Sequence, residues 1–362
     1  MDRFLLRIRQ KTPTVLDIVG SALLAIGLLL SPAAWGEPIR GAGSTFAAPI
    51  IAKWAEIYKT ARMDGGDFSS PDWTVDYELV GSLAGLMRLD QPELDFAATD
   101  VPVSHAELAQ HGRQQFPIVL GSVAIAINLD GVAQGQLNLS GPLLADIYLG
   151  KIQSWSDPAI KAINPDLVLP DLKISPIHRK DGSGTTYMFT EYLSSGSVEW
   201  KAKYGADTLI SWPLGTGVEG TQNLILAVKA TKGAIAYAES GQVERANLRF
   251  AAVQNKSGKF VKPGPEGVKA AQNAVDWLKA EDFAVSLTDQ PGDATYPICG
   301  ATFAVVPMTG QSSGRYRRVH DFFRLAFETG SRDAEALRYV PLSQPLVSEI
   351  EKYWLKEPSP AH

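Results

Sequence analysis

The stretch HRKDGSGTTYMF, residues 178–189, decides the fold that we expect for this chain. It follows the apolar run Ile174–Ile177, which predicts the end of a strand, and leads through Asp-Gly-Ser-Gly into a helix that should begin near Thr185. Such a turn places free backbone N–H groups and the positive end of a helix dipole at one point. Arg179 adds a guanidinium and Ser183 a hydroxyl. These residues predict a buried oxyanion site, although an exposed turn with a helix cap fits them as well.

Two further junctions of strand, glycine turn and helix come earlier in the chain. The loop Gly41–Phe46 leads into a helix with an apolar face, and the alternating run Trp73–Val80 leads through Gly81 and Ser82 into another helix. The run Leu94–Asp100 predicts a buried strand that ends on a carboxylate. Junctions of this kind are typical of open α/β sheets that bind ligands at the carboxyl ends of their strands.

The remaining sequence alternates between strands and helices and shows no internal repeat or low-complexity tract. Apolar runs predict strands at residues 116–128 and 298–306, buried on both faces or crossing between domains. Residues 253–265 read as a hairpin or loop. We expect helices at residues 143–155, 270–277, 318–329, 334–337 and 347–355, and a helix with its exit over residues 187–204.

The first 36 residues have the three parts of a secretory signal peptide. Four basic residues precede an apolar run from Ile18 to Leu30, and small residues follow at Ala34 and Gly36. We therefore expect export to the periplasm with cleavage before Glu37, the alternative being an uncleaved anchor. Removing the segment's net charge of +2 from the formal −5 leaves about −7 for the mature chain.

The charge and cysteine content exclude several classes of protein. An acidic chain lacks the basic surface on which general nucleic-acid binding depends. A single cysteine, Cys299, permits neither an intrachain disulfide nor a thiolate metal cluster, and its apolar setting predicts a buried thiol. A little over 320 mature residues suit two domains of ordinary size.

Motifs for other activities are weak. Gly215–Gly220 fits G-x-G-x-x-G, the dinucleotide fingerprint, but a glycine loop after Trp212 and Pro213 explains it equally well. No G-x-S-x-G elbow is present, and the spacing of His105 and His111 does not match a helical metal pair. We therefore expect neither catalysis nor a metal or cofactor.

Together the motifs resemble one family, the periplasmic phosphate-binding proteins of Pst-type phosphate ABC transporters. The likeness covers nearly the whole mature chain, in the order of the family, and is carried by Gly41–Pro49, Gly81-Ser82, Asp95–Asp100, Tyr148–Ile152, Arg179–Thr186 and Gly233–Tyr237. It implies an α/β protein of the type II periplasmic-binding-protein fold, with two hinged lobes, each a mixed sheet flanked by helices. Residues 37–118 with 298–362 would form lobe I and residues 119–297 lobe II, with crossing strands near Ile118 and Ile298.

The resemblance also implies a ligand and the residues that bind it. Inorganic phosphate would be held by Thr45, Phe46, Ser82, Asp100, Arg179, Ser183, Gly184 and Thr185, while Asp181 would orient Arg179. Asp100 would accept a proton that phosphate retains near neutral pH and that sulfate lacks. Two departures from the family pattern are Leu83-Ala84, in place of a smaller pair, and His178, where another basic residue is common.

The implied function is high-affinity phosphate binding and delivery to the integral-membrane permease subunits of an ABC transporter, by a monomer without a cofactor. An exported phosphatase is one alternative. It would need a metal cluster or an activated nucleophile, and the sequence shows neither. A receptor of the same fold for another oxyanion is the second alternative.

Overall fold

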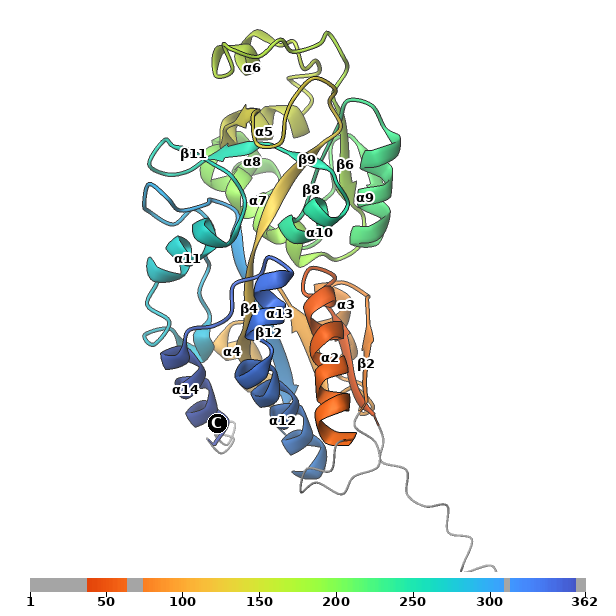
Figure 1. Ribbon diagram of the computed structural model, residues 1–362, viewed down its shortest axis with the longest axis vertical. Helices are drawn as coiled ribbons and strands as arrows, with labels where there is room; N and C mark the ends of the chain where they lie inside the picture. Colours follow the sequence, from red (N-terminus) through yellow and green to blue (C-terminus); the bar gives the residue numbers. More distant parts are fainter. Residues whose placement is uncertain (1–37, 64–73, 309–312, 356–362) are drawn as a thin grey trace, which may run out of the picture.

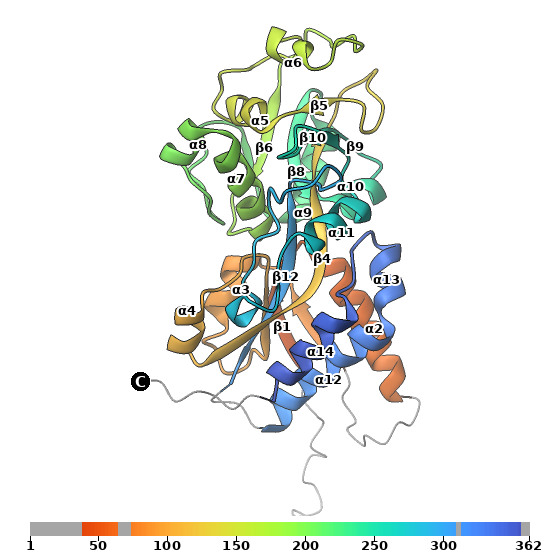
Figure 2. The same cartoon turned by 90° about the vertical axis from the view of Figure 1, so that its left-hand side faces the viewer.

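A computed structural model describes residues 38–63, 74–308 and 313–355 of the chain. The predicted signal peptide lies outside these residues. Figures 1 and 2 show an elongated molecule with two lobes and a narrow waist between them. This is the two-lobed α/β architecture that the sequence led us to expect.

One mixed sheet of nine strands, counted over the described residues, runs through both lobes in the order β2-β1-β3-β12-β4-β8-β6-β7, with β9 beside β4. The first lobe holds parallel β1 (Ile39–Gly43), β2 (Val75–Glu78) and β3 (Phe96–Thr99). The second holds β6 (Ser175–Arg179), β7 (Thr216–Val218), β8 (Ala234–Glu239) and β9 (Arg249–Phe250). A small separate sheet contains β5 (Asn138–Leu139), β10 (Ala252–Gln254) and β11 (Phe260–Val261).

Two long strands connect the lobes. β4 (Arg113–Ile127) and β12 (Cys299–Pro307) pair antiparallel along the waist, with a register shift between Thr302 and Phe303. β12 also pairs with β3, whereas β4 continues beyond the waist to pair with β8. The strands predicted near Ile118 and Ile298 are therefore the connections between the lobes (Figure 2).

Helices cover both lobes (Figure 1). Around the first lobe lie α2 (Ala48–Met63), α3 (Ser82–Arg88), α4 (His105–Gln110), α12 (Ser313–Thr329), α13 (Ser331–Ala336) and α14 (Gln344–Tyr353). Around the second lie α5 (Gly141–Tyr148), α6 (Pro158–Ala162), α7 (Gly184–Gly196), α8 (Val198–Lys203), α9 (Gly220–Ala230) and α10 (Ser240–Arg245). Helix α11 (Pro265–Asn273) and a 3-10 turn (Glu281–Phe283) lie on the return path to β12. Among the described residues, no helix has both the length and the apolar character needed to cross a bilayer.

The expected helices have different bounds in the structure: residues 187–204 divide into α7 and α8, and the helices expected over 318–329 and 347–355 begin at Ser313 and Gln344. The helix expected over residues 143–155 ends at Tyr148, because Gly150 adopts a left-handed φ of 78° that stops it. The helix expected over 270–277 begins earlier, with Pro265 in its first turn, and ends at Asn273. The sequence also failed to predict α9, whose buried face includes Leu224 and Val228.

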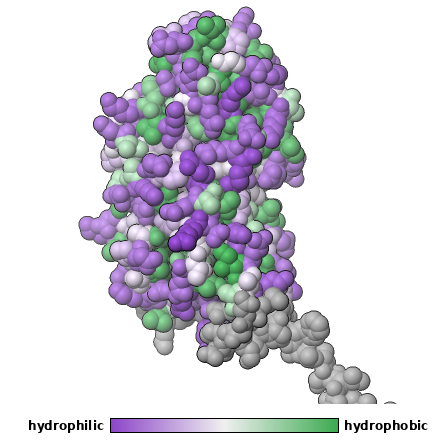
Figure 3. All heavy atoms as spheres, viewed as in Figure 1, coloured by the Kyte–Doolittle hydropathy of each residue, from purple (hydrophilic) through white to green (hydrophobic). Residues whose placement is uncertain are grey.

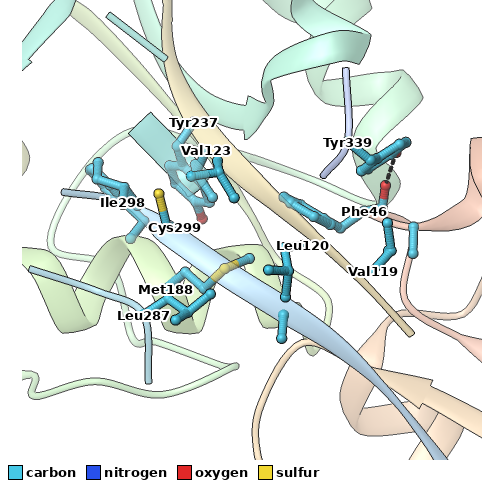
Figure 4. Packing of buried hydrophobic residues seen from close by; sticks show 14 of the residues in the cluster. Phe46, Val119, Leu120, Val123, Met188, Tyr237, Leu287, Ile298, Cys299 and Tyr339 are labelled. Carbon is cyan, nitrogen blue, oxygen red and sulfur yellow. Dashed lines mark hydrogen bonds between the residues drawn. The ribbon is translucent and has the colours of Figure 1, made fainter. Parts of the chain in front are cut away.

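The hydrophobic core continues through the waist. Figure 4 shows Leu120 of β4, Met188 of α7 and Cys299 of β12 packed together, with Phe46 and Tyr339 close by. Cys299 is buried, as predicted, and burial raises the pKa of its thiol. The face of the molecule seen in Figure 3 is mostly hydrophilic with scattered apolar residues. The lobes therefore share apolar packing as well as strands.

Glu239 ends β8 and caps α10 from inside the protein. Its side chain is 1% exposed. Its carboxylate accepts hydrogen bonds from the backbone N–H groups of Gly241, at 2.5 Å, and Gln242, at 2.8 Å, and Arg245 Nη2 lies 3.6 Å away. Burial raises the pKa of Glu239 to about 7, although these amides, Arg245 and the Tyr339 hydroxyl oppose the rise.

This raised pKa should make folding stability depend on pH. The native state keeps the Glu239 proton up to about pH 7, whereas the unfolded chain releases it near 4.5. The contribution of Glu239 to the free energy of unfolding is therefore complete below about pH 4.5. This contribution falls by roughly 3 kcal/mol as the pH rises to about 7. Glu239→Gln should remove this loss in urea unfolding measured at pH 5 and pH 8. The exposed-site control Glu335→Gln should keep it, and equal pH dependence in wild type and Glu239→Gln would contradict the assignment.

Candidate functional site

A buried carboxylate lies at the carboxyl edge of the first lobe's sheet. Asp100 directly follows β3 and is 3% exposed. Its Oδ1 accepts hydrogen bonds from Ser44 Oγ and Thr302 Oγ1, each at 2.7 Å, and its Oδ2 accepts one from Ser82 Oγ at 3.2 Å. Burial raises the pKa of Asp100, and the three hydroxyls and the charge of Arg179 partly offset the rise.

The three hydroxyls come from three different elements. Ser44 follows β1, Ser82 opens α3, and Thr302 lies on β12. They meet because β1, β3 and β12 are neighbours in the sheet. Asp100 is therefore held in place by hydrogen bonds from the loop after β1, the start of α3 and the interior of β12.

Arg179 approaches from the other lobe, at the end of β6. It is 2% exposed, and its guanidinium forms a fork with Asp181: Nε donates to Oδ1 at 2.6 Å and Nη2 donates to Oδ2. Burial alone would raise the pKa of Asp181, but the hydrogen bonds and charge of Arg179 outweigh it and lower that pKa. Asp181 thus fixes the orientation of Arg179 and neutralises part of its charge.

Arg179 also reaches across the gap between the lobes. Its Nη1 donates to Thr45 Oγ1 at 3.0 Å and to Thr221 Oγ1 at 3.3 Å, and the two threonine hydroxyls are 2.8 Å apart. Thr45 belongs to the first lobe, whereas Thr221 lies in the first turn of α9 in the second. The structure therefore holds the lobes in contact at this point.

The turn from β6 to α7 faces Asp100. Ser183 caps α7, and its Oγ accepts a hydrogen bond from the Thr186 N–H at 3.3 Å. The N–H groups of Gly184 and Thr185 belong to the first turn, so they have no carbonyl one turn earlier. A Cβ on Gly184 would lie 2.5 Å from Ser82 Oγ and 2.6 Å from Asp100 Oδ2. The positive end of α7 therefore abuts the Asp100 carboxylate at a distance that only glycine permits.

Phe46 contributes its backbone next to the site and its side chain to the core. Its N–H donates to Ser44 Oγ at 3.1 Å. Its carbonyl accepts hydrogen bonds from Tyr339 Oη at 2.6 Å and Gln242 Nε2 at 3.3 Å. The ring is fully buried (Figure 4). The loop that carries Thr45 is thus fixed on three sides.

The two departures noted in the sequence have structural explanations. The Leu83 N–H donates to the Gly182 carbonyl at 3.2 Å, so this amide forms a bond between α3 and the turn before α7. His178 is buried and stacks on Trp212, with ring centroids 4.8 Å apart, and burial lowers its pKa. His178 thus belongs to the aromatic core of the second lobe.

The structure brings Thr45, Phe46, Ser82, Asp100, Arg179, Asp181, Ser183, Gly184 and Thr185 into one region between the lobes. Sequence reasoning missed Ser44, Thr221 and Thr302 as members of it. Tyr237 was also missed; its hydroxyl accepts the Arg179 backbone N–H at 3.1 Å. Thr302 gave a weak signal, a lone hydroxyl in an otherwise apolar strand.

A cavity of about 770 Å³ opens beside this region and is lined by both lobes. Thr45 and Tyr77 line it from the first lobe, and Asp181, Thr221 and Gln242 from the second. Within the described part of the chain, no group of three or more His, Cys, Asp or Glu side chains is placed to hold a metal ion. The site therefore combines hydroxyl and amide donors, one guanidinium and two carboxylates, which suits a small anion that carries a proton.

Comparisons with known proteins agree with this geometry. The family profile of the PBP superfamily domain matches residues 14–319, so the fold and the site between its lobes define a protein of this superfamily. A phosphate-binding protein from Stenotrophomonas maltophilia has a similar fold, with a TM-score of 0.65 at 19% identity over 88% of this chain and 94% of that one.

Curated relatives narrow the assignment. The phosphate-binding protein PstS of Xylella fastidiosa is 39% identical over 319 residues, 88% of this chain and 85% of the relative. That of Pasteurella multocida is 38% identical over 321 residues, 89% of this chain and 91% of the relative. The chain belongs to the PstS family of phosphate-binding proteins.

The hydrogen bonds to Asp100 make a prediction about its ionisation. Thr302→Val removes one of the two 2.7 Å bonds to Oδ1, so the pKa of Asp100 should rise further. At neutral pH the free energy of unfolding should fall by about 1–3 kcal/mol. Carbon-13 NMR of the aspartate carboxyl groups measures the first effect and urea unfolding the second. Thr302→Ser, which keeps the hydroxyl, should behave nearly as wild type, and an unchanged Asp100 titration in Thr302→Val would refute this account.

Proposed function

We propose that this protein binds inorganic phosphate between its lobes and delivers it to the permease subunits of an ABC transporter. The observation that carries the proposal is the position of Asp100, a buried acceptor that faces the positive end of α7 and lies beside Ser82. A site of donors with one fixed acceptor fits an anion that still holds a proton. Family membership supports the same function, since the relatives are named phosphate-binding proteins.

The proposed contacts divide between the lobes. The first lobe supplies Thr45 and Phe46 from the loop after β1, the Ser82 hydroxyl and the Asp100 carboxylate. The second supplies Arg179 and the α7 terminus, with donors from Ser183, Gly184 and Thr185. Asp181 orients Arg179 without contacting the ligand. Closure of the lobes would bring both sets onto one phosphate.

The charges of the site explain how it could select phosphate. Asp181 partly neutralises Arg179, so fixed dipoles and hydroxyls must provide much of the attraction for a doubly charged anion. Asp100 would repel any anion that has no proton to donate, because two acceptors would then face each other. Sulfate is such an anion near neutral pH. Phosphate avoids this penalty.

Lobe boundaries and cellular location complete the proposal. We assign residues 37–118 and 298–362 to lobe I and residues 119–297 to lobe II, because β4 and β12 connect the lobes near both boundaries. We further propose export to the periplasm with cleavage before Glu37, and action as a monomer. The N-terminal composition supports the export signal.

Equilibrium binding of phosphate and sulfate tests the function and its selectivity. Titration calorimetry should show tight phosphate binding and sulfate binding at least a hundredfold weaker. Asp100→Asn supplies an amide donor in place of one carboxylate oxygen, so the preference for phosphate should fall at least tenfold. Equal affinity of the wild type for both anions would sink the selectivity argument. Turnover of a phosphomonoester, with or without divalent metal, would instead favour the phosphatase alternative.

The glycine at the start of α7 provides an independent test. Gly184→Ala places a methyl group within 2.6 Å of Asp100 and Ser82, so the lobes cannot close fully around a ligand. Phosphate affinity should fall at least a hundredfold. Gly141→Ala, at the start of α5, is the matched control because its added Cβ meets other atoms only at 3.4 Å. If both variants bind phosphate alike, the close approach of α7 to Asp100 has no role in binding.

A further inference from the structure

The segment Gly215–Gly220, which the sequence suggested was a simple glycine loop, forms one wall of the site. It contains β7 beside β6 and ends at the first residue of α9. The Gly220 N–H donates to Asp181 Oδ1 at 3.2 Å. The next residue, Thr221, directs its hydroxyl at Arg179 and Thr45. Gly220 thus contacts the carboxylate of the fork, and Thr221 contacts its guanidinium.

Thr221 is buried where the two lobes meet. Its residue is 4% exposed, and its Oγ1 lies 2.8 Å from Thr45 Oγ1 and 3.3 Å from Arg179 Nη1. Arg179 Nη1 also lies 3.0 Å from Thr45 Oγ1. The three groups therefore form a closed triangle of hydrogen-bonding atoms, with one corner in the first lobe and two in the second.

Counting protons and lone pairs in this triangle fixes the direction of the two bonds from Arg179, whereas the bond between the two hydroxyls can run either way. Arg179 can only donate, so both threonine oxygens accept from Nη1. Each hydroxyl has one proton and two lone pairs. If Thr221 donates to Thr45, both lone pairs of Thr45 Oγ1 are filled, one by Arg179 and one by Thr221. The proton of Thr45 is then left to point at an acceptor in the site.

We propose that Thr221 is a positioning residue for phosphate binding. Its hydroxyl donates to Thr45 Oγ1 across the cleft and so directs the Thr45 proton toward the anion. The inference rests on the proposed phosphate function. Because Thr45 and Thr221 lie in different lobes, their bond forms only in the closed state, and it should therefore slow release of the ligand more than it speeds capture.

Substituting Thr221 separates this role from a structural one. Thr221→Val keeps the shape of the side chain and removes the hydroxyl, so phosphate Kd should rise about tenfold, mainly through faster dissociation in stopped-flow measurements. Association should change less than twofold. Thr221→Ser restores the hydroxyl and should bind within threefold of wild type. Thr288→Val removes a buried hydroxyl bonded to the Cys299 carbonyl, away from the site, and should leave Kd unchanged.

A double-mutant cycle tests whether Thr221 acts through Thr45. In a Thr45→Val background there is no hydroxyl to orient, so adding Thr221→Val should change phosphate Kd less than twofold. A full tenfold loss in that background would overturn the inference, as would a Thr221→Val single variant that binds like wild type or that loses affinity through slower association. Failure of the wild type to bind phosphate would instead overturn the proposed function, on which the inference depends. Urea unfolding of each variant confirms that the folded protein is being compared.

Discussion

The structure depends on one buried carboxyl group, that of Asp100, and the donors around it. Burial of Asp100 opposes its ionisation, and the hydroxyls of Ser44, Ser82 and Thr302 together with the charge of Arg179 partly offset that cost. Ser44, Ser82 and Arg179 stand at the end of a strand or the start of a helix, which is where an α/β sheet leaves polar groups free, whereas Thr302 lies within β12. The same arrangement brings the start of α7 against the carboxylate. A cleft that holds an acceptor among donors follows from this constraint, and the proposed preference for an anion that bears a proton rests on it.

The waist links that site to the movement of the lobes. β12 carries Thr302, which bonds to Asp100, and it pairs with β4 as both strands pass from one lobe to the other. The register shift at Thr302 lies in the same stretch of β12. Arg179 and Thr45 meet across the gap, so ligand contacts and contacts between lobes involve the same side chains. In the proposed function, the same side chains would therefore couple phosphate binding to closure of the lobes.

The sequence predicted the parts of this arrangement that depend on local pattern. Two kinds of feature were recognisable because each is visible in consecutive residues. They are the glycine turns before α2, α3 and α7 and the apolar strands β4 and β12. The helix expected over residues 143–155 was too long, because nothing local shows that Gly150 takes a positive φ. Helix α9 was missed because the glycines before it indicate a loop. Ser44, Thr221 and Thr302 escaped notice for a different reason: their roles exist only once distant strands and both lobes are placed together.

A crystal structure of the protein with bound phosphate is the most direct test of the central claim. We expect one phosphate enclosed between the lobes, within hydrogen-bonding distance of Thr45 Oγ1, Ser82 Oγ, Arg179 and the Gly184 N–H, with one phosphate oxygen paired to Asp100. Phosphate bound on an outer surface, or in the cleft with Asp100 turned away from it, would contradict the account.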